Sequence, residues 1–73
     1  MTADMEEINA DGVRVRNTPS TSGTVLGLLY KGEQVEVSDT MYYGSGYSWY
    51  YIISVKTGIS GYVVTSYVTV YDS

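Results

Sequence analysis

The chain has 73 residues, 44% hydrophobic and 16% charged, and it contains neither Cys nor His. A chain of this length has room for one small domain, and without these two residue types most hydrolase chemistry, disulfides and thiolate metal sites are excluded. Its net charge of −4 opposes binding to nucleic acid or anionic lipid, and no uncharged apolar run approaches the roughly 20 residues of a membrane span.

The chain begins with an acidic segment. Residues 1–7 have no hydrophobic period and few bulky apolar groups, which predicts a linker or an expression remnant followed by one domain over 8–73. From Val13 the pattern changes to period two, because Val13 and Val15 alternate with two arginines. That alternation is typical of a strand with one face packed and one face in water.

Further β-branched and aromatic runs follow, separated by turn residues such as Asp-Gly, Lys-Gly and Gly-Ser-Gly. No stretch has the apolar stripe and caps of a helix. The sequence therefore predicts an all-β chain with strands at 8–10, 13–17, 25–30, 34–43, 48–55, 61–64 and 69–71, and a single 3₁₀ turn at 65–67.

The run from Trp49 to Val55 is apolar at both parities. A strand of this kind has one face on the core and the other in a groove, on a ligand or against a neighbouring domain. The alternative is that Trp49 or Tyr51 lies half exposed at the rim, since single exposed apolar groups are common. Charge is scarce between Met41 and Tyr71, where Lys56 is the one charged residue.

The order of these segments resembles that of the bacterial Src-homology-3 (SH3b) family. The resemblance covers about residues 8–70 and is carried by five segments in the family's order: VRVRNTPS at 13–20, VLGLL at 25–29, KGEQVEV at 31–37, WY at 49–50, and GYV at 61–63 with YV at 67–68. It implies a small SH3-like, partly open β-barrel of five to seven short strands, with a long loop at 18–24. The chain is also similar to the versions in clostridial and bacillar wall hydrolases and phage endolysins, where the module holds an enzyme on peptidoglycan.

The chain departs from the family's pattern in loops and grooves. Arg14 stands where Asn is usual, Thr18 where Gly is usual, and Tyr62 where Trp is frequent. Two connections, 41–48 and 54–60, look longer than the family's minimum. These departures concern the ligand more than the fold.

Nine Tyr and no Phe favour a surface that is both apolar and hydrogen-bonding, because a tyrosine ring can stack on a sugar or lie along a peptide while its hydroxyl bonds an amide. Tyr42, Tyr43 and Tyr47 flank the Gly-Ser-Gly tip and, with Trp49 and Tyr51, form the predicted ligand surface. The other tyrosines considered are expected at the rim of the core, with satisfied hydroxyls: Tyr30, Tyr50, Tyr62 and Tyr67.

A second candidate patch lies on the long loop, where Asn17, Thr18 and Ser22 offer short hydrogen-bonding groups. These groups can also satisfy the backbone of the loop itself. Arg14 and Arg16 share one strand face, where they can meet a ligand carboxylate or pair with Glu36 or Asp39 on a neighbouring strand. We favour the pairing.

Catalytic constellations are poor. The remaining acid/base option is a pair of carboxylates, and Glu6 with Glu7, Glu33 with Glu36, and Asp39 all lie in polar contexts that shift a pKa little. The Gly-Ser-Gly tip matches neither a nucleophile elbow nor a phosphate loop. We expect no enzyme activity, no cofactor and no metal.

The sequence and the resemblance together predict a non-catalytic module that binds peptidoglycan, through its stem peptide, cross-bridge or glycan. Its expected location is extracellular or at the cell wall. Since residues 1–10 lack the parts of a signal peptide, we expect it to be exported or released within a larger protein. The alternative is a domain that packs against other domains of its parent chain or against a protein partner.

Overall fold

A computed structural model describes residues 5–71. They form seven strands and one 3₁₀ turn, with no α-helix in this range: β1 (Met5–Ile8), β2 (Val13–Arg16), β3 (Val25–Leu29), β4 (Val35–Gly44), β5 (Tyr47–Ser54), β6 (Ser60–Val64), η1 (Thr65–Tyr67) and β7 (Val68–Tyr71). The prediction of a small all-β, SH3-like domain is confirmed. Six strands begin and end within one residue of the predicted bounds.

The first strand differs from its prediction. The sequence predicts a linker over 1–7 and a strand at 8–10, whereas residues 5–8 form β1 and pair with β7 in the register Glu6 with Val70 and Ile8 with Val68. Residues 1–4 lie outside the described residues. The pairing is made by backbone hydrogen bonds, which need no hydrophobic period in the added strand, so the acidic composition did not reveal it.

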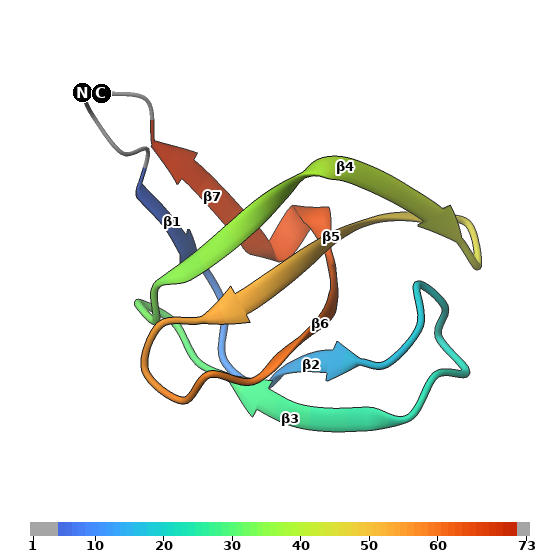
Figure 1. The fold of residues 1–73 in the computed structure, drawn as a ribbon, viewed down its shortest axis with the longest axis horizontal. Coiled ribbons are helices and arrows are strands. Elements are labelled where there is room, and N and C mark those ends of the chain that lie inside the picture. Colours follow the sequence, from blue (N-terminus) through green and yellow to red (C-terminus); the bar gives the residue numbers. More distant parts are fainter. Residues whose placement is uncertain (1–4, 72–73) are drawn as a thin grey trace.

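The other five strands form one antiparallel sheet in the order β3-β2-β6-β5-β4. The sheet curls round on itself (Figure 1). It stays open, because its edge strands β3 and β4 do not pair with each other. Beside β4, Ile8 donates its backbone N–H to the carbonyl of Glu33 and accepts from the N–H of Gly32. The core inside the curl is made by Ile8, Val13, Val15, Leu29, Val35, Ile52, Val63 and Val68.

The β4–β5 hairpin closes in a tight turn. Residues 41–44 pair with residues 47–50, so most of the 41–48 segment, which the sequence analysis treats as a connection, belongs to the two strands. Ser45 and Gly46 make the turn, with φ of 54° and 80°. Two successive positive φ angles match the natural twist of paired strands, so a two-residue turn suffices to reverse the chain.

The long loop between β2 and β3 folds back against this hairpin. A Cβ on Gly44 would overlap the carbonyl oxygen of Pro19, so the two backbones meet where only glycine fits. The backbone N–H of Thr21 donates to the hydroxyl of Ser45 at 3.0 Å. These contacts hold the 17–24 loop beside the start of β5, next to the hairpin turn, where the candidate site lies.

Candidate ligand-binding site

The outer face of β4, β5 and β6 carries a cluster of three tyrosine rings. The ring of Tyr62 contacts those of Tyr42 and Tyr51 edge to face, each with a centroid separation of 5.1 Å. Strand pairing explains the cluster, since Tyr51 and Tyr62 are opposite each other in the β5–β6 ladder. Two predicted ligand residues, Tyr42 and Tyr51, are thus joined through Tyr62, which the sequence assigns to the rim of the core.

Trp49 lies on the same outer face but is only 1% exposed. Its indole Nε1–H donates to the carbonyl of Gly44 at 2.9 Å, and the ring of Tyr47 packs edge to face against it at 6.2 Å. Trp49 thus lines the pocket described below as a buried residue, and its role toward a ligand stays a prediction. The folded-back 17–24 loop and the hairpin turn meet beside it, and that long-range packing leaves no local signal in the sequence.

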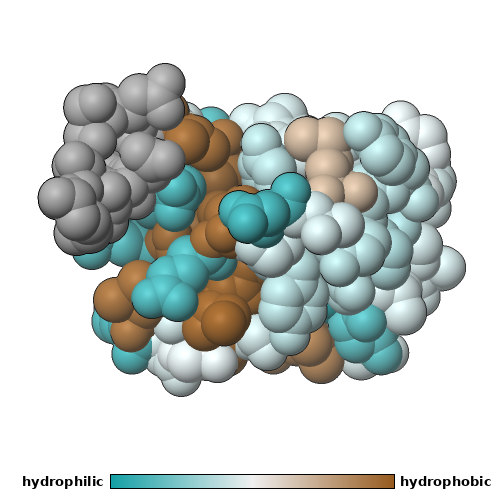
Figure 2. Space-filling model, turned by 45° about the horizontal axis from the view of Figure 1, so that its top comes forward, coloured by the Kyte–Doolittle hydropathy of each residue, from teal (hydrophilic) through white to brown (hydrophobic). Residues whose placement is uncertain are grey.

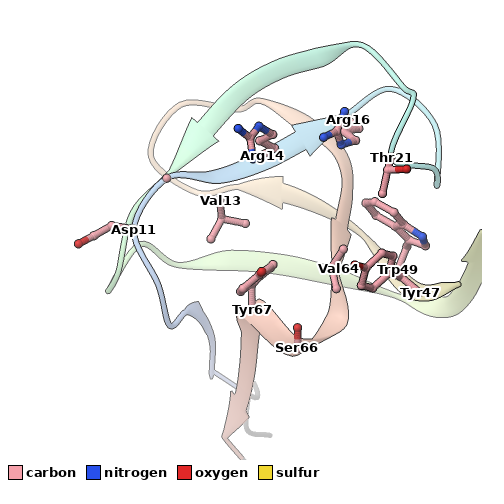
Figure 3. A pocket seen from close by; sticks show the side chains of 11 residues that line it. Asp11, Val13, Arg14, Arg16, Thr21, Tyr47, Trp49, Val64, Ser66 and Tyr67 are labelled. Atoms are coloured by element: carbon pink, nitrogen blue, oxygen red, sulfur yellow. The ribbon is translucent and has the colours of Figure 1, made fainter. Parts of the chain in front are cut away.

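A pocket of about 410 Å³ opens between β2 and the start of β5. This volume lies within the usual range for small-ligand sites, about 300–1,000 Å³. Figure 3 shows the two arginines of β2 on one side, residues of η1 on the opposite side, and two aromatic rings at one end. Its lining residues are Asp11, Gly12, Val13, Arg14, Arg16, Thr21, Tyr47, Trp49, Val64, Ser66 and Tyr67.

The arginines of this pocket do not make the predicted ion pairs. Glu36 and Asp39 lie on β4, which is separated from β2 by β6 and β5, so the favoured pairing of Arg14 and Arg16 with these acids is wrong. Arg16 instead donates from Nη1 to the carbonyl of Gly23 at 2.8 Å, which braces the 17–24 loop. Arg14 is exposed, and its side chain has no hydrogen bond or ion pair within the described part of the chain.

The polar residues of the loop bond mainly to the loop itself. Asn17 Oδ1 accepts the backbone N–H of Thr24 at 2.9 Å, and the hydroxyls of Thr18, Ser20 and Ser22 form a chain with 3.1 Å between neighbours. This arrangement matches the structural role that the sequence left open for them. All three predicted ligand residues, Asn17, Thr18 and Ser22, are nevertheless exposed, and their role toward a ligand stays a prediction.

Tyr43 stands apart from the other predicted ligand residues. It is 75% exposed, and its hydroxyl donates to Sδ of Met41 at 3.3 Å. As neighbours along a strand, Tyr42 and Tyr43 point to opposite faces of the sheet. The predicted set is therefore divided into Tyr47 and Trp49 in the pocket, Tyr42 and Tyr51 in the ring cluster, and Tyr43 on the other face.

Hydropathy divides the molecule along its long axis. On the face seen in Figure 2, strongly hydrophobic residues gather in the left half, whereas the right half, toward the β4–β5 turn, is mostly pale. Pale colours mark residues of intermediate hydropathy, and this end of the hairpin is rich in Tyr, Ser and Gly. Such a surface combines apolar rings with hydrogen-bonding groups.

Part of the pocket lining that the sequence analysis missed comes from the segment 64–67, near the end of the chain. Val64, Ser66 and Tyr67 line the pocket, and none of them belongs to the predicted ligand residues. Within residues 5–71 no group of three or more potential metal ligands occurs. No helix in that range has the length and apolarity to cross a membrane.

The fold defines the class as a small SH3-like β-domain, and its surface carries an open pocket. The model of the family described as "Bacterial SH3 domain" matches residues 11–69. The chain belongs to this family, which is generally associated with cell-wall binding and whose members commonly bind peptidoglycan, are typically non-catalytic and typically occur in cell-wall-associated proteins. Comparisons with curated proteins and with solved structures found no match.

Proposed function

We propose that this domain is a non-catalytic module that binds peptidoglycan and holds a wall-associated protein on a bacterial cell wall. Its parent would be an exported or released protein such as a clostridial or bacillar wall hydrolase or a phage endolysin, as the sequence resemblance suggests. The observation that carries the proposal is an open pocket lined by both aromatic rings and guanidinium groups in a member of this family.

The pocket suits a polymer that offers apolar faces and amides side by side. Tyr47 and Tyr67 are exposed at its rim, while buried Trp49 supports Tyr47 from below. Tyrosine rings of this kind pack on sugar or peptide while their hydroxyls bond to amides, at a low cost in side-chain entropy.

The proposed contact surface continues from the pocket onto the neighbouring elements. It includes the exposed loop residues Asn17, Thr18 and Ser22 and the ring cluster with Tyr42 and Tyr51. A single domain with so open a site binds modestly. Tandem copies or an attached enzyme raise retention through effective concentration.

Retention on purified Gram-positive sacculi tests the proposal. We expect the folded domain to sediment with sacculi, and Tyr47→Ala to weaken retention about five-fold or more, the effect of losing a contact worth at least about 1 kcal/mol. Tyr30→Ala is the matched control, because Tyr30 is equally exposed, 49% against 51%, and does not line the pocket. Absence of wild-type retention on sacculi of every wall type tried would contradict the proposal.

A second candidate function is packing against other domains of the parent chain or a protein partner. It is favoured by Val25, Leu26 and Leu28, which are exposed on the edge strand β3, because an unpaired apolar edge can accept another chain. Sedimentation equilibrium separates the two functions. Self-association that Leu28→Lys abolishes, without retention on sacculi, would favour this second function.

A further inference from the structure

Half of the basic side chains in the chain lie on the wall of one pocket. The chain has four Lys and Arg residues against eight Asp and Glu, yet Arg14 and Arg16 both line the pocket between β2 and β5. The two arginines are separated by one residue on β2, so their side chains point from the same face of the strand, roughly 7 Å apart. A net-negative domain thus presents a local concentration of positive charge at its candidate site.

The protein does not neutralise this charge with its own acids. The two strands beside β2 are β3 and β6, and neither contains Asp or Glu. Asp11 is the one acid among the residues that line the pocket, and its Oδ1 accepts the backbone N–H of Lys31 at 3.0 Å. Figure 3 shows the carboxyl of Asp11 directed away from the middle of the pocket.

The two guanidinium groups have different tasks. Arg16 donates one N–H to the carbonyl of Gly23, and this hydrogen bond fixes the guanidinium beside the loop. The guanidinium of Arg14 makes no hydrogen bond or ion pair within the described residues, so its N–H donors are free for a ligand. A guanidinium with free donors is the group that best fits the two oxygens of a carboxylate.

We infer that the pocket binds a peptide that carries a free carboxylate, which Arg14 holds with Arg16 as the neighbouring donor. The inference rests on the proposed function, since the peptide part of peptidoglycan is what would bring such a carboxylate to the pocket. Val64 and the rings of Tyr47 and Tyr67 supply walls for the apolar body of the peptide. The phosphate groups of other wall polymers offer the same charge, but their polyol chains lack an apolar body for these walls.

Chemical capping of the wall tests the inference. Sacculi stripped of phosphate polymers are divided, and the carboxyls of one half are converted to methylamides with carbodiimide. Wild-type domain and the variants Arg14→Gln and Lys56→Gln are then titrated onto both preparations. Lys56→Gln is the charge-matched control, because Lys56 is exposed and lies outside the pocket, and circular dichroism checks that each variant is folded.

We expect capping to weaken retention of the wild type and of Lys56→Gln about ten-fold or more, the effect of losing a hydrogen bond to a charged group. Arg14→Gln should bind weakly and equally to both preparations. Equal binding of the wild type to both, or a variant Arg14→Gln that still distinguishes them, would overturn the inference and leave wall binding intact. A further titration uses sacculi that keep their phosphate polymers, and wild-type retention that is lost on stripping but unchanged by capping would assign the pocket to phosphate. Absence of retention on either preparation would instead overturn the proposed function.

Discussion

At the scale of single residues, Trp49 has a different role from the one its sequence context suggests. It lies on the outer face of the sheet, where an aromatic side chain would be available to a ligand, yet it is buried and bonded to the carbonyl of Gly44. Exposed residues that line the same pocket include Arg14, Tyr47 and Tyr67. Trp49 therefore supports the pocket from within, and the exposed residues around the pocket are the ones that a ligand can reach.

Replacing Trp49 by Phe tests this structural role. Trp49→Phe leaves the carbonyl of Gly44 without its donor and removes part of a buried ring, so we expect the free energy of unfolding to fall by about 1–3 kcal/mol. Urea denaturation measures it. Tyr43→Phe is the control, because Tyr43 is largely exposed and should change stability by less than about 0.5 kcal/mol. Equal stability of Trp49→Phe and wild type would contradict the assignment.

At the scale of elements, the site depends on how the 17–24 loop is attached to the β4–β5 hairpin. Two contacts make the attachment, the close approach of Gly44 to Pro19 and the hydrogen bond from Thr21 to Ser45. The bond from Arg16 to Gly23 ties the same loop to β2. The loop brings Thr21 to the pocket wall. Loop and hairpin thus act as one unit, although they are distant in sequence.

A methyl group on Gly44 should separate them. Because the added Cβ would overlap the carbonyl oxygen of Pro19, we expect Gly44→Ala to cost about 1–3 kcal/mol of stability, the usual cost of overpacking. The amide of Thr21 should then exchange faster in hydrogen-exchange NMR. Ser45→Ala removes only the single hydrogen bond and should cost about 0.5–1.5 kcal/mol. A Gly44→Ala domain with unchanged stability and exchange would contradict the attachment.

At the scale of the whole molecule, the strands were predictable and their arrangement in space was not. Alternation at residues 13–16 and the aromatic run in β5 mark strands directly, because each pattern is local. The order of the sheet places β6 between β2 and β5, so Arg16 pairs with Tyr62 and not with an acid of β4. Neighbours of this kind follow from topology, to which local patterning gives no access.

The same reason explains why most of the pocket was missed. Tyr47 and Trp49 are conspicuous in the sequence, whereas Val64 and Tyr67 join them only through the β5–β6 ladder and the 3₁₀ turn that follows it. The outer ends of β1 and β7 lie at the opposite end of the long axis from the β4–β5 turn (Figure 1), so this turn projects away from that end.

The central claim is that this pocket receives the wall peptide, and a ¹H–¹⁵N NMR titration with soluble muropeptides released by a muramidase tests it most directly. We expect the largest shift changes at Arg14, Thr21, Tyr47 and Tyr67, together with the indole N–H of Trp49, all of which line the pocket. Changes confined to β3, or to the exposed turn around Lys31 and Lys56, would contradict the claim.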